Sequence, residues 1–220
     1  VRSYWKKLDN ENNFTVPNET IFRLLGHNKF NIKKKKILDV GIGDGANLLE
    51  FYRRGATIYG ADIREGMIKN FYKTYGFPGK NYFICDLNYN FPNLKTKMDL
   101  INCKDTICYL DINKQFDFIY NCQKNLKKNG LFLFQYIQKQ LVKKNNQIFD
   151  FNLKKDHKEL KEYFNKSNPI PFLTNKHVND LIKFSKMKVE KSIFDLITHT
   201  KEKKQIIDVN RYFLLRKTKI

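Results

Sequence analysis

The feature that most constrains this chain is a glycine-rich turn in residues 37–47, ILDVGIGDGAN, at the end of an apolar run. The run KKILDV predicts a buried strand, because aliphatic and β-branched residues lead up to the first glycine. The following stretch, ANLLEFYRR, predicts a helix with Leu48, Leu49 and Tyr52 on one face and Gly55 as its end. A buried strand that passes through glycines into a helix is the start of a βαβ unit.

Strand and helix patterns alternate along most of the remaining chain. Apolar runs predict further strands at residues 56–63, 82–87, 97–103 and 131–137. Amphipathic stretches predict helices at 65–76 and 113–126, the second with Phe116, Ile119, Tyr120 and Leu126 facing inward. Repeated units of this length predict a doubly wound, Rossmann-like α/β fold, with a mostly parallel sheet and helices on both faces.

The C-terminal part departs from this alternation. The stretch TNKHVNDLIKFS predicts a helix that Thr174 caps. Residues 188–197 and 209–218 then predict two consecutive strands, separated by the charged connector 198–205. Because two strands joined in this way form an antiparallel hairpin, we expect the sheet to end in an antiparallel pair.

The formal charge of +20 at pH 7 raises the question of a nucleic-acid partner, since clustered Lys and Arg neutralise phosphates. Lysine supplies most of this charge, and Asn and Ile are also abundant. This indicates a general drift of the composition toward Lys, Asn and Ile rather than selection for a charged partner. Arginine, which forks better onto phosphate, is scarce. Nucleic-acid binding is therefore possible but not favoured.

Other features narrow the class of protein. No run of ~20 apolar residues is present and residues 1–13 lack the apolar core of a signal peptide, so we expect a cytoplasmic protein without a membrane segment. The four cysteines form no C-x-x-C pair and have no histidine at ligand spacing, so we expect no metal site. A length of 220 residues fits one domain with an elaboration, and nothing in the sequence indicates the oligomeric state.

The glycine turn is typical of a site for a cofactor that carries a nucleotide. In an open α/β sheet the ligand lies beyond the carboxyl ends of the strands, where Gly41, Gly43 and Gly45 let the backbone approach it closely. Asp62 ends the second strand, at a distance suited to a ribose hydroxyl. The turn also satisfies a dinucleotide pattern, so on its own it fits NAD and S-adenosylmethionine almost equally.

Three further features favour S-adenosylmethionine. Asp39 precedes the turn, where a carboxylate suits the ammonium and sulfonium groups of that cofactor and repels the pyrophosphate of NAD. The third strand ends in Asp86 and Leu87, which can hold the edge and the face of an adenine ring. The closing hairpin replaces the all-parallel ending that a dinucleotide fold predicts.

From residue 36 to residue 217 the chain resembles the class I S-adenosylmethionine-dependent methyltransferases. The motifs that carry the resemblance are ILDVGIGDGAN, YGADIREGM, FICDLN, DLINCKDTICYL and LKKNGLFLF. One departure is Lys128-Asn129-Gly130 in place of the usual Pro-Gly-Gly before the fifth strand, and Asn tolerates the geometry of that turn. The resemblance implies S-adenosylmethionine as cofactor and S-adenosylhomocysteine as product.

The resemblance also implies roles for individual residues. Those around the cofactor, from its methionine end to its adenine end, are Asp39, Gly41, Gly43, Gly45, Asn102, Cys103, Asp62, Ile63, Asp86 and Leu87. Asn102 and Cys103 would act through their backbone, and Asp62 would hold both ribose hydroxyls. Tyr4 resembles an N-terminal tyrosine that closes over the cofactor in small-molecule members.

Methyl transfer requires the acceptor atom to lie about 3 Å from the methyl carbon, in line with the bond that breaks. The end of the fourth strand, NCKD, lacks the signatures of adenine amino and cytosine C5 methyltransferases, which counts against base methylation. An alcohol acceptor needs a general base, and an amine must arrive deprotonated. The candidate groups on the acceptor side are Asp105, Tyr109, Tyr136, His157 and His177, of which we favour Asp105 and the two tyrosines.

We therefore expect a methyltransferase that acts on a hydroxyl or amine of a small molecule, such as a sugar, a lipid precursor or a secondary metabolite. The alternatives are an RNA methyltransferase that uses the lysine-rich surface and an NAD-binding Rossmann protein. Residues 1–35 would form an arm that caps the cofactor, and residues 36–220 the methyltransferase domain. An insertion at 138–173 would form a wall over the acceptor.

Overall fold

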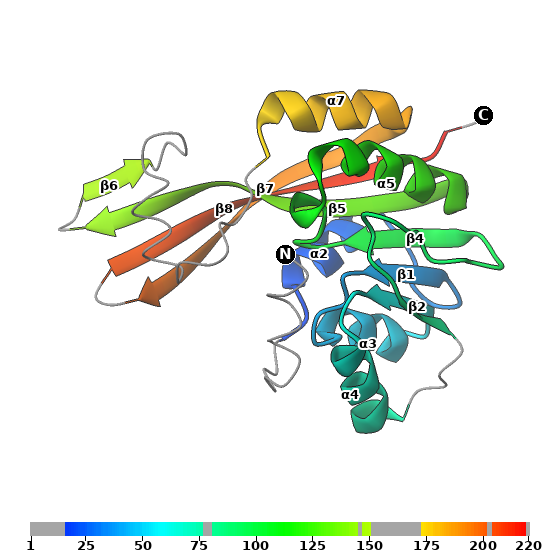
Figure 1. Cartoon of the computed structure of the whole chain (residues 1–220). Coiled ribbons are helices and arrows are strands. Elements are labelled where there is room, and N and C mark those ends of the chain that lie inside the picture. Colours follow the sequence, from blue (N-terminus) through cyan, green and yellow to red (C-terminus); the bar gives the residue numbers. More distant parts are fainter. Residues whose placement is uncertain (1–15, 77–80, 145–146, 151–172, 202–203, 219–220) are drawn as a thin grey trace.

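The computed structural model describes residues 16–76, 81–144, 147–150, 173–201 and 204–218 of the chain. They form one eight-stranded sheet with helices on both faces (Figure 1). The strand order is β3-β2-β1-β4-β5-β8-β7, and β6 pairs with the far end of β5. The predicted fold class is confirmed, because the sheet is mostly parallel and ends in an antiparallel hairpin.

The first five strands are parallel to one another: β1 (Lys36–Val40), β2 (Thr57–Asp62), β3 (Tyr82–Ile84), β4 (Met98–Cys103) and β5 (Leu126–Lys144). The antiparallel strands are β6 (Gln147–Asp150), β7 (Lys188–Lys201) and β8 (Lys204–Arg216). The helices are α2 (Glu19–His27), α3 (Ala46–Arg53), α4 (Glu65–Tyr75), α5 (Ile112–Asn125) and α7 (Asn175–Ser185), with a 3₁₀ turn η2 (Ile107–Tyr109) after β4. None of the described helices has the length and apolar character needed to cross a membrane.

Two helical layers enclose the sheet, and the pleat of each strand decides which layer a side chain meets. The helices α5 and α7 cover one face, where Phe118 and Leu181 pack near Phe134 of β5. The helices α2, α3 and α4 cover the other face, where Leu24 packs in the same cluster as Leu133 of β5. Neighbouring residues of β5 therefore serve opposite layers.

Three strands are longer than the sequence predicts. The fifth strand, expected at 131–137, runs from Leu126 to Lys144, and the expected polar connector at 198–205 is largely strand. Figure 1 shows these strands projecting with β6 beyond the helical layers. Hydrophobic alternation marks strands that rest on a core, whereas an antiparallel ladder satisfies its backbone groups whatever the side chains are. Of the predicted insertion at 138–173, residues 145–146 and 151–172 lie outside the described residues.

Two tyrosines predicted to face the core are exposed. The side chain of Tyr52 in α3 is 49% exposed and that of Tyr120 in α5 is 52% exposed. Phe51 and Phe118 are buried in their place, so in each helix the aromatic side chain without a hydroxyl is the one that faces the sheet. The predicted cap of α7 is confirmed, since the side chain of Thr174 accepts a hydrogen bond from the backbone of His177.

Candidate active site

The carboxyl ends of the parallel strands bring the predicted cofactor residues to one edge of the sheet, which we call the carboxyl edge. The register pairs Asp39 of β1 with Gly60 of β2 on one side and with Asn102 of β4 on the other. Asp62 ends β2, and Asp86 follows the end of β3. In open α/β sheets this is the edge at which ligands bind.

The three glycines of the turn have positive φ angles, 72° at Gly41, 56° at Gly43 and 83° at Gly45. A Cβ atom on Gly41 would lie 1.9 Å from Oγ1 of Thr106, and one on Gly45 would lie 2.1 Å from the ring of Phe71. At Gly43 the nearest atom would be 3.8 Å away. Two of the glycines therefore make room for side chains of the protein itself, and Gly43 leaves the surface of the turn open.

Asp39 is a buried carboxylate, 2% exposed, that accepts a hydrogen bond from Nδ2 of Asn102 at 2.7 Å. Burial raises the pKa of Asp39 to about 7, although the hydrogen bond from Asn102 and the charge of Lys104 act in the opposite direction. The other side-chain atom of Asn102, Oδ1, is buried and accepts no hydrogen bond from the described residues. A buried acceptor without a hydrogen bond lowers the free energy of unfolding by about 1–3 kcal/mol. A ligand that donates a hydrogen bond to this atom would recover that free energy.

Both carboxylate oxygens of Asp62 already have partners. The backbone N–H of Gly43 donates to Oδ2 at 3.0 Å, and that of Arg64 donates to Oδ1 at 2.9 Å. The guanidinium of Arg64 adds an ion pair, with Nε 3.4 Å from Oδ1. Asp62 thus ties the glycine turn to the end of β2, while Ile63 beside it is half-buried.

Asp86 and Leu87 lie after β3, which ends at Ile84, three residues earlier than predicted. The Asp86 carboxylate accepts hydrogen bonds from the backbone and the side chain of Asn88, at 3.1 and 3.2 Å. This local turn competes with the strand ladder and explains why β3 is short. Leu87 is half-buried against the cluster under α5.

Asp105 has a left-handed backbone, with φ 54°, which is uncommon for a residue other than glycine. Its N–H donates to Oε1 of Gln135 in β5 at 2.8 Å, and its carboxylate pairs with Nζ of Lys104. The Asp105 side chain is 39% exposed. It is therefore held in place through its backbone, while its carboxylate reaches solvent at the carboxyl edge.

Gln135 belongs to a row of polar residues that the sequence analysis missed. Gln135, Asn210 and Tyr212 are buried on one face of β5 and β8, where the register pairs Gln135 with Tyr212. Nε2 of Gln135 donates to Oδ1 of Asn210, and Nδ2 of Asn18 donates to the hydroxyl of Tyr212 at 3.0 Å. The signal was present, since buried polar side chains require partners and each interrupts an apolar run.

Tyr136 is not brought together with Asp105. It lies on the opposite face of β5 from Gln135, is 0% exposed, and sits in the same aromatic stack as Phe134 and Phe213. Its hydroxyl points to Oδ1 of Asn175 at 3.4 Å. Because side chains alternate along a strand, Tyr136 faces the layer of α5 and α7 whereas Gln135 faces the other layer, and an acceptor-side role for Tyr136 stays a prediction.

The remaining candidates occupy different settings. Tyr109 lies in η2, half-buried against the cluster under α5. Cys103 is fully buried, and burial raises the pKa of its thiol well above the ordinary value, so it is no nucleophile. His177 contacts Oε1 of Gln115 at 2.7 Å and packs edge-on against Phe116, which is a structural role. Tyr4 and His157 lie outside the described residues.

The described residues contain no group of three or more His, Cys, Asp or Glu side chains arranged to hold a metal ion. The carboxylates of the carboxyl edge are instead engaged one by one with an amide, a guanidinium or an ammonium group. The arrangement suits an organic ligand that presents both hydrogen-bond donors and positive charge.

Residues 38–134 match the sequence model of a protein family described as a methyltransferase domain. The matched segment contains the glycine turn and every strand end that builds the site. No curated protein is significantly similar to this chain in sequence.

Solved methyltransferase structures share the fold. Magnesium protoporphyrin IX methyltransferase from Synechocystis PCC 6803 with bound SAH is 13% identical, with a TM-score of 0.63 over 98% of this chain and 93% of that chain. A SAM-dependent methyltransferase from Methanosarcina mazei is 14% identical, with a TM-score of 0.65 over 93% and 99%. The N-methyltransferase NodS from Bradyrhizobium japonicum WM9 is 10% identical, with a TM-score of 0.58 over 92% and 99%.

Proposed function

We propose that this chain is a class I S-adenosylmethionine-dependent methyltransferase and that it methylates a hydroxyl or an amine of a small molecule. The assignment to the methyltransferases rests on the matched domain, residues 38–134, which includes the glycine turn and the acids at the strand ends, together with the shared fold. The chemical class of the acceptor and the role of each residue are the proposal.

The observation that carries the cofactor site is the buried pair of Asp39 and Asn102 beside the glycine turn. Asp39 is a carboxylate without a cationic partner in direct contact among the described residues, and Oδ1 of Asn102 lacks a donor. The ammonium group of a methionine moiety would supply the charge and the donor at once. These two residues therefore fit S-adenosylmethionine better than a pyrophosphate, which would add negative charge and no donors.

The other strand ends would hold the rest of the cofactor. Asp62 would accept from the ribose hydroxyls and share its carboxylate with Arg64 and the turn. Asp86 would meet the edge of the adenine, with Ile63 and Leu87 against its faces. Tyr4, on the N-terminal arm, would close over the site. When bound, S-adenosylmethionine supplies a methyl group on a positively charged sulfur.

On the acceptor side, Asp105 is the residue we assign as general base. Its carboxylate is the one at the end of β4 that reaches solvent, and Gln135 fixes the backbone that carries it. Asp105 would take the proton from an alcohol, while an amine acceptor would bind in its neutral form. Tyr109, the last residue of the 3₁₀ turn η2 that follows Asp105, would border the acceptor.

Two relatives in fold support an acceptor of small size. One is named for magnesium protoporphyrin IX and another as an N-methyltransferase. Within this chain, residues 138–173 would supply the wall over the acceptor, since β5 continues past the carboxyl edge and its last residues lie beyond it. The polar row of Gln135, Asn210 and Tyr212 would line the neighbouring part of the cleft.

The proposal is tested by transfer of a labelled methyl group from S-adenosylmethionine to a pool of small alcohols and amines, with total RNA offered in a parallel reaction. We expect label in the small-molecule fraction only. With an alcohol that the wild type methylates, Asp105→Asn should lower kcat by about 10²-fold or more, which is the range for loss of a general base. The affinity for S-adenosylhomocysteine should be unchanged. Label in RNA alone, or an unchanged kcat in Asp105→Asn, would contradict the proposal.

A further inference from the structure

Positive charge gathers at the edge of the sheet opposite the carboxyl edge, where the parallel strands begin. We call this surface the basic edge. Its cationic side chains are Lys33, Lys34, Lys35, Lys36, Lys95, Lys97, Lys124, Lys127, Lys128, Arg216 and Lys217. They come from the end of α5, from the loops before β1 and β4, from the first residues of β1 and β5, and from the end of β8, which runs antiparallel and so finishes at the same edge.

Hydrogen bonds join these segments into one surface. Nζ of Lys97 donates to the carbonyl of Lys124 at 2.7 Å, which links the start of β4 to the end of α5. Nζ of Lys217 donates to the carbonyl of Leu126 at 3.0 Å, and Nη1 of Arg216 donates to that of Asn129 at 3.2 Å. The end of β8 therefore lies against the start of β5.

Few carboxylates neutralise this charge in the described part of the chain. Asp99 lies 2.8 Å from Nζ of Lys127 and 3.9 Å from that of Lys35, and it also accepts from the backbone of Lys36. Burial acts to raise the pKa of Asp99, but these partners outweigh it and hold the pKa below its ordinary value. Glu190 pairs with Arg216 at 3.0 Å.

The lysines of the basic edge also act on one another. Partial burial and the charge of Lys97 lower the pKa of Lys217, so these two ammonium groups repel each other. Like charges held together on a surface lose this repulsion when an anion binds between them. Ammonium groups spaced along the whole basic edge can bind many phosphates of one polyanion at once, whereas a single small anion would contact only a few of them.

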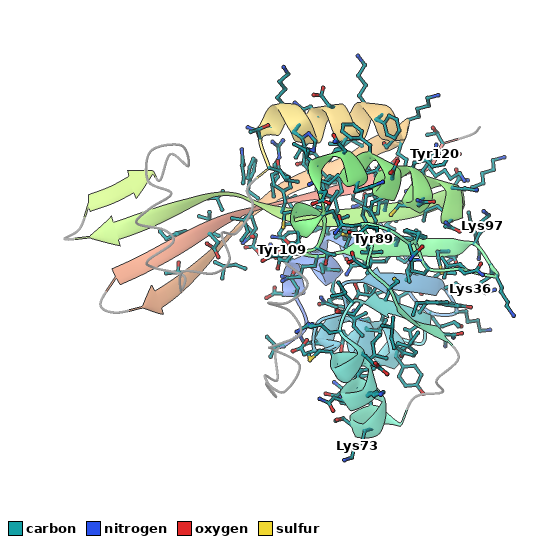
Figure 2. The ribbon with its side chains drawn as sticks, viewed as in Figure 1. Lys36, Lys73, Tyr89, Lys97, Tyr109 and Tyr120 are labelled. Carbon is teal, nitrogen blue, oxygen red and sulfur yellow. The ribbon has the colours of Figure 1, made fainter. Side chains whose placement is uncertain are left out.

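The basic edge lies away from the cofactor cleft. Figure 2 shows Lys36 and Lys97 at one end of the central strands and Tyr109 toward the other. The carboxyl edge carries Asp39, Asp62 and Asp105, two of which pair with Arg64 and Lys104, so it lacks the excess of positive charge found at the basic edge. A polyanion is drawn to one edge, and the other stays open to a cationic cofactor.

We propose that the basic edge binds the phosphate backbone of a nucleic acid, as a docking surface separate from the methylation site. A general drift toward lysine explains the total charge of the chain but not its concentration where the strands begin. A membrane surface is the less favoured partner, because interfacial binding also buries apolar side chains. Among the large apolar side chains that are exposed in the described residues, Tyr52, Tyr120 and Val189 lie near this edge, on three different elements, so they form no continuous apolar surface along one element.

The test compares two triple variants with the same net charge. One replaces exposed lysines of the basic edge, Lys95→Gln, Lys124→Gln and Lys128→Gln. The matched control replaces exposed lysines elsewhere, Lys73→Gln, Lys114→Gln and Lys176→Gln. Binding of a fluorescein-labelled 20-nucleotide RNA of mixed sequence is followed by anisotropy between 50 and 300 mM salt, with S-adenosylhomocysteine affinity as a check of folding.

We expect the wild type to bind the RNA with a strong dependence on salt, near 0.7 per neutralised phosphate in a log–log plot. The basic-edge variant should bind about tenfold more weakly with a slope flatter by about 2, while the control changes less than about twofold. Equal weakening in both variants would overturn the proposal, because it would mean general attraction to a cationic chain. Failure to bind RNA together with capture on phosphatidylserine vesicles would overturn it in favour of a membrane.

Discussion

Asp39 illustrates how a single residue links the stability of the chain to its ligand. The carboxylate is buried at the centre of the sheet, beside the turn, with one hydrogen bond from Asn102. Its pKa is raised from 3.8 to about 7, mainly by burial. The folded chain therefore holds a proton between pH 4 and 7 that the unfolded chain has lost. The contribution of Asp39 to stability is complete below pH 4 and is lost as the pH rises through 7.

This titration predicts a change in ligand affinity. A ligand with an ammonium group favours the ionised carboxylate, so affinity for S-adenosylhomocysteine should rise about tenfold from pH 6 to pH 8 as Asp39 loses its proton. Asp39→Asn keeps the shape of the side chain and should abolish this rise. The variant should also have a higher Tm than the wild type at pH 8 and a smaller gain at pH 5. Calorimetric titration at both pH values checks the prediction, and a flat profile in the wild type would contradict it.

The glycines of the turn make a second prediction at the residue scale. Alanine at either Gly41 or Gly43 would sit in the left-handed region, which costs roughly 1–2 kcal/mol. At Gly41 the new Cβ would also collide with Thr106, whereas at Gly43 it would have room. Gly41→Ala should therefore lower the free energy of unfolding by at least ~2 kcal/mol more than Gly43→Ala in urea titrations. Gly43→Ala should instead act mainly on ligand affinity, and equal losses of stability would show that Thr106 yields at little cost.

At the scale of elements, α2 is tied to the cleft through its first residues. Asn18 caps the helix by accepting from the backbone of Ile21, and its Nδ2 donates to the buried hydroxyl of Tyr212 in β8. Its backbone N–H also donates to Asn47 of α3 at 2.8 Å. The helix that precedes β1 thus holds the first turn of α3 and the polar row of β8 in one arrangement.

A pair of cap variants tests this coupling. Asn18→Ala removes a cap and leaves the hydroxyl of Tyr212 without its donor, while Thr174→Ala removes only the cap of α7. The cap itself is worth about 1 kcal/mol in both cases. Asn18→Ala should therefore be more destabilising by about 1–3 kcal/mol, the cost of an unpaired buried group. In a Tyr212→Phe background the difference should disappear, and its persistence would place the cost elsewhere.

The elements also show what a single sequence can and cannot predict. The glycine turn and the acids at the ends of β1 and β2 were predictable, because they follow apolar runs that can only be buried strands. The length of β5 and β8 was not, since a ladder beyond the core leaves no hydrophobic pattern. The face of Tyr136 could have been predicted from the pleat once Gln135 was recognised as a cleft residue. The pairing of Gln135 with Asn210 depends on register between strands 75 residues apart, which the sequence does not specify.

At the scale of the whole molecule, the described residues separate charge between the two edges of one sheet. Carboxylates lie where the strands end and lysines where they begin, with an apolar core between them. The net charge of +20 thus conceals an edge where carboxylates gather with few lysines beside them, which suits a cationic cofactor. RNA held at the basic edge would be bound away from the carboxyl edge, so the lysine content alone does not indicate RNA methylation.

The cofactor cleft is tested most directly by thermal unfolding of the chain with S-adenosylhomocysteine, S-adenosylmethionine and NADH in parallel. At ~100-fold excess over the dissociation constant a bound ligand adds about 2.7 kcal/mol of stability, which gives an easily measured rise in Tm. We predict a rise with both adenosyl ligands, none with NADH, and a loss of the rise in Asp62→Ala. A rise in Tm with NADH alone would contradict the proposed S-adenosylmethionine site, since it would mean that the glycine turn beside Asp39 binds a pyrophosphate.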